Sequence, residues 1–196
     1  NITNLIYYLM KILLVDNYDS FTYNLFHLLQ DKVSKVDVVR NDKIDFDKVK
    51  KYNKIVLSPG PGLPSESSML KPLIKNFASK KSILGICLGH QAIGEVFGCK
   101  MLKMSKVRHG VNSVLTFYDK SDYIFKGLKE PIEVGLYHSW CLDNKSISDS
   151  IKIIAKSDRI IMALSHEKFD VKGLQFHPES ILTPQGEKLI DNWLNY

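Results

Sequence analysis

The clearest strand-turn-helix signal in this chain is Ser82-Ile83-Leu84-Gly85-Ile86-Cys87-Leu88-Gly89-His90-Gln91. The apolar run at 82–86 predicts a buried strand, and the helical spacing that follows predicts a helix over 88–97 that Gly98 closes. Glycines two positions before and after Cys87 allow the sharp turn by which G-x-S-x-G hydrolases hold a nucleophile above the edge of a sheet. The stretch therefore predicts an α/β fold with Cys87 at a strand-to-helix turn.

The same alternation of strands and helices precedes this stretch. Strands are predicted at 11–15, 34–40 and 54–58, and helices at 20–30 and 69–77. Such alternation indicates right-handed crossovers and an open, mostly parallel sheet with helices on both faces, as in flavodoxin-like folds. After Gly98 the chain is β-rich, with segments at 111–118, 132–137, 151–155, 160–165 and 173–176. Thr183, followed by Pro184, predicts the cap of a last helix.

We therefore expect a single α/β domain over residues 10–196, in which the later strands add antiparallel pairs. Residues 1–9 are interpreted as an N-terminal extension or a cloning remnant. Their apolar run is too short to span a membrane and lacks the basic region of a signal peptide. No membrane partner is expected.

The composition limits the classes of function. The chain has 196 residues, of which 44% are hydrophobic and 24% charged, and these values exclude disorder, collagen and coiled coil. The net charge of +6 suggests a nucleic-acid partner, but nearly all of it comes from scattered lysines. Because lysine lacks the planar fork that arginine uses for bidentate contacts, we interpret the charge as compositional bias and expect no nucleic-acid partner.

The cysteines Cys87, Cys99 and Cys141 are odd in number and widely spaced, without a CxxC pair. This pattern argues against a disulfide framework and against a zinc site, and it favours a reducing compartment. We expect a cytoplasmic protein without a metal site.

A thiol nucleophile needs a base, and His177 is the best placed of the six histidines. It stands in Phe176-His177-Pro178-Glu179, where Glu179 can fix the tautomer of the imidazole and stabilise its protonated form. His27 and His90 are expected on helix surfaces, and His138 before a loop. Cys87, His177 and Glu179 thus form a candidate catalytic triad. The alternative is that Cys87 is an ordinary small core residue.

The third motif is Pro59-Gly60-Pro61-Gly62, at the end of the third predicted strand. In a doubly wound sheet this end opens on the same edge as the end of the next strand, where Cys87 lies. The N–H groups of Gly60 and Leu88 can then both donate to an oxyanion. Taken alone, the motif is typical of an ordinary turn. GxGxxG and GxxxxGK[ST] are absent, so a dinucleotide or P-loop site has no support.

These three motifs, in this order and spacing, resemble the class I (triad) glutamine amidotransferases over residues 10–196. Two further segments, 16–22 and 179–183, narrow the resemblance to the glutaminase subunits that serve anthranilate synthase or aminodeoxychorismate synthase. The resemblance implies that Cys87 attacks the side-chain amide of glutamine and that His177 acts first as base and then as acid. Glu179 would orient His177, and a γ-glutamyl thioester would be hydrolysed to glutamate.

The resemblance also implies a substrate pocket. For L-glutamine it would be lined by Gly60, Pro61, Gly62, Leu88, Gln91, Ser139 and Trp140. The family usually has leucine at the position of Trp140, so backbone groups rather than the indole are expected to serve the substrate there.

A partner is implied as well, namely a chorismate-binding synthase subunit (component I) that takes up the ammonia within a hetero-oligomer. Mg²⁺ is expected only in that partner, and no cofactor in this chain. The segment Arg108-His109-Gly110 is expected at the interface. Two other classes remain open, a stand-alone thiol hydrolase of related fold and a catalytically inactive binding module.

Overall fold

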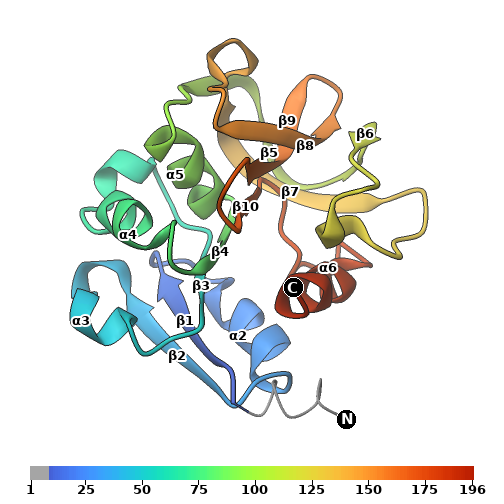
Figure 1. Ribbon diagram of the computed structural model, residues 1–196. Coiled ribbons are helices and arrows are strands. Elements are labelled where there is room, and N and C mark those ends of the chain that lie inside the picture. Colours follow the sequence, from blue (N-terminus) through green and yellow to red (C-terminus); the bar gives the residue numbers. More distant parts are fainter. Residues whose placement is uncertain (1–8) are drawn as a thin grey trace.

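The computed structural model describes residues 9–196, in which an eight-stranded sheet has the order β2-β1-β3-β4-β10-β9-β8-β6 (Figure 1). Five neighbouring strands run parallel: β2 (Lys35–Arg40), β1 (Lys11–Asp16), β3 (Lys54–Leu57), β4 (Ser82–Ile86) and β10 (Val171–Leu174). The antiparallel pairs that follow involve β9 (Ile160–His166), β8 (Ile151–Ser157) and β6 (Phe117–Tyr118). The expected mostly parallel α/β sheet with added antiparallel strands is confirmed.

Alternating side chains of the parallel strands supply two buried clusters, one on each face of the sheet. In β1, Ile12 and Leu14 join one cluster, and Leu13 and Val15 join the other. The helices α2 (Thr22–Gln30) and α6 (Gly186–Leu194) complete the first cluster. The second is completed by α3 (Phe46–Val49), α4 (Leu70–Phe77) and α5 (Leu88–Val96). Short 3₁₀ turns connect these elements at Asn41–Lys43, Pro64–Glu66, Tyr123–Phe125 and Asn144–Ser146.

A separate antiparallel pair, β5 (Met101–Val114) and β7 (Glu133–Leu142), lies beside the main sheet (Figure 1). The strand predicted at 111–118 is in fact the end of β5 followed by β6, and the strand predicted at 132–137 continues to Leu142. The prediction that His138 precedes a loop is wrong, because this residue lies inside β7. The register between the two strands shifts between Lys103 and Arg108, opposite the part of β7 that contains Ser139.

Two predictions about the chain ends have different outcomes. Thr183 does not cap the last helix, because α6 begins at Gly186 with Gln185 as its N-cap. The Thr183 hydroxyl instead donates to the His177 carbonyl at 2.6 Å and accepts from the Gly135 N–H at 2.9 Å. The extension expected at 1–9 lies, apart from Leu9, outside the described residues.

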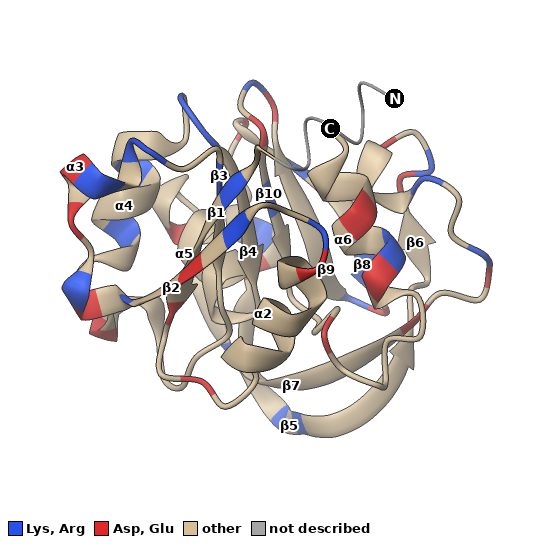
Figure 2. Ribbon diagram, turned by 90° about the horizontal axis from the view of Figure 1, so that it is seen from below, with Lys and Arg blue, Asp and Glu red and all other residues tan. Residues whose placement is uncertain are grey.

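Charged residues of both signs are interspersed along the ribbon (Figure 2). Within residues 9–196, no helix is long and apolar enough to cross a membrane.

Candidate active site

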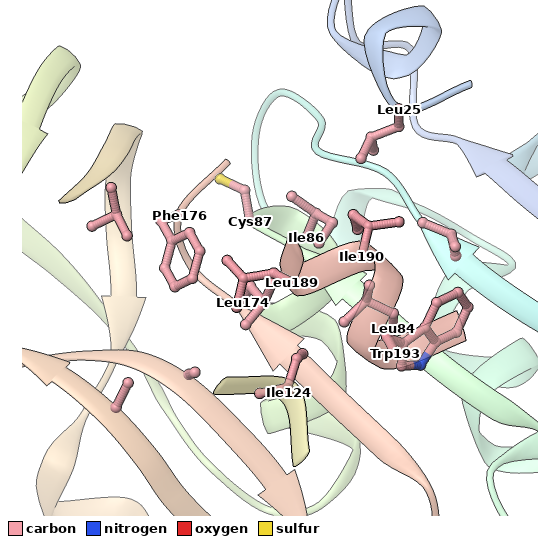
Figure 3. Packing of buried hydrophobic residues seen from close by; sticks show 14 of the residues in the cluster. Leu25, Leu84, Ile86, Cys87, Ile124, Leu174, Phe176, Leu189, Ile190 and Trp193 are labelled. Carbon is pink, nitrogen blue, oxygen red and sulfur yellow. The ribbon is translucent and has the colours of Figure 1, made fainter. Parts of the chain in front are cut away.

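Cys87 occupies a strained turn between β4 and α5. Its backbone has φ 49° and ψ −96°, a conformation that few non-glycine residues adopt, and its N–H donates to the Leu174 carbonyl at 2.7 Å. A Cβ atom on Gly89 would lie 2.6 Å from the Leu57 carbonyl oxygen, so α5 can approach β3 this closely only with glycine at that position. The side chain of Cys87 belongs to the same buried cluster as Phe176 (Figure 3). The predicted strand-to-helix turn at Cys87 is therefore present.

The loop after β3 packs against the start of α5. A Cβ atom on Gly60 would lie 2.6 Å from Leu88 Cδ2 and 2.7 Å from Asn17 Cβ. The buried side chain of Asn17 donates from Nδ2 to the Ser58 carbonyl at 2.8 Å, and its Oδ1 accepts from Asn41 at 3.0 Å. These bonds fix the loop, and Asn17 thereby gains a structural role that the sequence did not reveal.

His177 and Glu179 form a buried pair. Nδ1 of His177 lies 2.6 Å from Oε1 of Glu179, and the two side chains are only 2% and 0% exposed. The rings of Tyr137 and Phe21 pack against the imidazole at centroid distances of 4.9 and 5.6 Å. With Nδ1 held by the carboxylate, Nε2 is the nitrogen left to exchange a proton with the thiol.

The charges around His177 favour its protonated form. Burial lowers the pKa of His177, but the Cys87 side chain, followed by the Glu179 carboxylate, outweighs burial and raises the pKa to about 10. An imidazole with this pKa keeps the proton that it takes from a neighbouring thiol. The arrangement can therefore supply a thiolate for attack on a carbonyl carbon and an imidazolium to protonate a leaving group.

A cavity of about 210 Å³ opens beside Cys87. Six of the seven predicted substrate residues line it, namely Gly60, Pro61, Gly62, Gln91, Ser139 and Trp140. Leu88 does not line this cavity and lies against a neighbouring one of about 440 Å³, although its N–H stands at the start of α5 next to Cys87. Trp140 contributes its carbonyl oxygen, which accepts from Gln91 Nε2 at 2.9 Å.

Tyr137 and His138 also line the cavity, and sequence reasoning had given neither of them a role in the site. His138 is fixed by a 2.9 Å hydrogen bond between its Nδ1 and the Trp140 carbonyl, and burial lowers its pKa to about 4. His90 corrects an expectation, because it is fully buried rather than on a helix surface, and burial lowers its pKa to about 3. Most of α5 packs inside the protein, so the usual rule that a polar residue faces solvent fails there.

Within residues 9–196, no group of three or more His, Cys, Asp or Glu residues could hold a metal ion. Arg108 and His109, expected at an interface, lie at the register shifts of β5. Of the two, His109 is exposed, and its ring centroid lies 5.5 Å from that of Tyr137.

Comparisons with known proteins agree with this geometry. The family profile "Glutamine amidotransferase class-I" matches residues 13–195. The chain is 45% identical to anthranilate synthase component 2 of Cyanophora paradoxa, with 94% of this chain and 98% of the relative covered. It is 42% identical to aminodeoxychorismate synthase component 2 of Klebsiella aerogenes, with 94% and 99% covered.

Among solved structures, a protein described as a GMP synthase candidate from Thermoplasma acidophilum superposes with a TM-score of 0.84 at 26% identity. This likeness covers 95% of this chain and 92% of the other.

Proposed function

The chain belongs to the class I glutamine amidotransferase family, and we propose that it is the glutaminase subunit of a chorismate-using synthase, anthranilate synthase first. The observation that carries the proposal is the arrangement of Cys87, the His177–Glu179 pair and the adjoining cavity. Near-complete coverage of relatives named component 2 supports the assignment to a synthase.

The proposed reaction uses Cys87 as nucleophile. The thiol proton passes to His177, and the sulfur bonds to the carboxamide carbon of glutamine. The Gly60 and Leu88 N–H groups hold the resulting oxyanion. When the C–N bond breaks, His177 gives its proton to the departing nitrogen, which leaves as ammonia. Water, deprotonated by His177, then attacks the γ-glutamyl thioester, and glutamate and the thiolate are released.

Neutral groups would hold the substrate. Both N–H groups of Gln91 Nε2 are engaged, by the Trp140 carbonyl and by Gln175, so only Oε1 of Gln91 is left to accept from the substrate. Tryptophan in place of the family's leucine at 140 is compatible with this pocket, because its carbonyl takes part in the hydrogen bonding.

The ammonia would pass to a component I synthase that binds chorismate and Mg²⁺, whereas this chain would need no cofactor of its own. The second candidate is the same role in aminodeoxychorismate synthase, which the Klebsiella aerogenes relative supports. All three cysteines are free, and this supports a reducing compartment, the cytoplasm.

The test is to combine the protein with each candidate synthase partner in turn and to measure chorismate conversion with glutamine and with ammonium. Cys87→Ser should abolish the glutamine-dependent reaction and leave the ammonium-dependent reaction unchanged. A variant that still used glutamine would refute Cys87 as nucleophile. The synthase that gains glutamine-dependent activity identifies the partner, and turnover of glutamine that needs no partner would favour a stand-alone hydrolase.

A further inference from the structure

A chain of hydrogen-bonded amide groups runs from the wall of the cavity to the nucleophile. Gln91 Nε2 donates to the Trp140 carbonyl at 2.9 Å and to Gln175 Oε1 at 3.3 Å. Gln175 Nε2 in turn donates to Cys87 Sγ at 3.6 Å. Gln175 is 0% exposed, so water does not compete for these bonds.

The Trp140 carbonyl, as the first acceptor, fixes the donor-to-acceptor direction of this series of hydrogen bonds. A backbone carbonyl can only accept, so Gln91 must present its NH₂ group to Trp140. The second hydrogen of that group is then directed to Gln175, whose oxygen must face it. This leaves the NH₂ group of Gln175 for the sulfur of Cys87. The orientation of both side-chain amides therefore follows from one backbone group, and Gln175 is a donor to the sulfur.

Gln175 and His177 both reach Cys87 from the segment that follows β10. Past the end of β10 the chain bends at Gln175 and Phe176, where the Gln175 N–H donates to the Met162 carbonyl of β9 at 2.8 Å, so this segment remains anchored to the sheet. Phe176, between the two residues, packs in the buried cluster (Figure 3). One segment thus supplies both a hydrogen-bond donor and a base to the nucleophile.

We propose that Gln175 stabilises the Cys87 thiolate, an assignment that rests on the proposed role of Cys87 as nucleophile. When the thiol proton moves to His177, Cys87 Sγ becomes negatively charged. The hydrogen bond that Sγ accepts from the Gln175 N–H is then charge-assisted and stronger. The charge passes to the carbonyl oxygen as the carbon–sulfur bond forms, and it returns to sulfur when water cleaves the thioester. Gln175 therefore favours both the formation of the thiolate and its departure.

Two substitutions test this role. Gln175→Met has a similar length and removes the donor. Gln175→Glu keeps an oxygen acceptor for Gln91 but turns a carboxylate toward the sulfur. The readout is the rate of Cys87 alkylation by iodoacetamide, followed peptide by peptide from about pH 5 to about pH 10, since only the thiolate reacts. Cys87→Ser and the exposed Gln30→Met serve as controls.

We expect the pH at which alkylation is half-maximal to rise by about one unit in Gln175→Met, the equivalent of a tenfold loss of thiolate, and further in Gln175→Glu. The kcat for glutamine should fall about tenfold with a smaller change in KM, and ammonium-dependent synthesis by the complex should stay unchanged. Gln30→Met should match the wild type in every measurement.

Thermal unfolding shows which variants are folded. If Gln175→Met does not fold, Gln175→Glu decides the test, because it keeps the size of the side chain and one hydrogen bond. An unchanged alkylation midpoint in a folded variant would overturn the assignment. An unchanged alkylation midpoint, together with a Cys87→Ser variant that does not hydrolyse glutamine, would refute the role of Gln175 but not the proposed function. If Cys87→Ser still hydrolysed glutamine, the proposed function itself would fail.

Discussion

The proposed catalytic pair makes different demands on its two residues. His177 would transfer the proton, whereas Glu179, 2.6 Å from Nδ1, would orient the ring and stabilise its charge. We expect His177→Ala to lower kcat/KM for glutamine by about 10²–10⁴-fold and Glu179→Ala by about tenfold to a hundredfold, because the imidazole remains. Steady-state glutaminase assays compare them, with Glu187→Ala, at an exposed position of α6, as control. Equal losses would contradict the division of roles.

The same pair should set the alkaline limit of the proposed activity. His177, with a pKa of about 10, stays protonated at neutral pH and loses its proton only as the pH approaches that value. The glutaminase rate should therefore persist above about pH 8 and fall near pH 10. Because the Glu179 carboxylate raises this pKa, Glu179→Gln should move the alkaline limb of the kcat profile to lower pH. A limb that stayed in place would show that Glu179 does not stabilise the imidazolium.

At the level of elements, the sequence predicts best where local pattern and tertiary environment agree. The strands at 11–15, 54–58 and 82–86 coincide with β1, β3 and β4 to within a residue, because each is a short apolar run bounded by turn residues. The prediction misses the first part of β5, residues 101–110. Its residues are largely exposed and carry Lys103, Lys106 and Arg108, so the alternation typical of a half-buried strand is absent.

The site residues divide in the same way, into those that a local motif predicts and those that only the fold brings together. Cys87, His177 and Glu179 stand in short motifs that local sequence reveals, and the structure brings six of the seven predicted pocket residues around one cavity. Asn17, Tyr137 and Gln175 could not be assigned in this way. Their roles depend on contacts with residues 41, 40 and 88 positions away, and such contacts exist only in the folded chain.

The approach of α5 to β3 provides a test with a matched control on the same helix. Ala at position 89 would meet the Leu57 backbone carbonyl, whereas Ala at position 94 would meet the movable end of the Leu142 side chain. Gly89→Ala should therefore lower the free energy of unfolding by about 1–3 kcal/mol and disturb the Cys87 turn. Gly94→Ala should lower the free energy of unfolding by less, because the higher helix propensity of alanine offsets part of the strain. Denaturant unfolding measures both, and equal effects would argue against a close-packed turn.

At the scale of the whole molecule, the lining of the cavity bears on the proposal that the ammonia acceptor binds to a partner. No Lys or Arg is among the described residues that line it. Chorismate carries two carboxylates, for which a binding site needs cationic groups or oriented N–H donors. The pocket of about 210 Å³ thus suits a compact neutral amide and its zwitterionic backbone better than a dicarboxylate. Under the proposed function, a partner then provides the site of the acceptor, and ammonia must travel between the two proteins.

This separation leads to a prediction about the route of the nitrogen. Ammonia released into water near neutral pH is largely protonated and no longer nucleophilic, so an efficient complex should keep it out of bulk solution. With glutamine carrying a heavy-nitrogen label in its amide, and excess unlabelled ammonium present, the product should retain the label at short reaction times. A complex containing Cys87→Ser should incorporate only unlabelled nitrogen. If the wild-type product were instead diluted in proportion to the added ammonium, the ammonia would be passing through solvent.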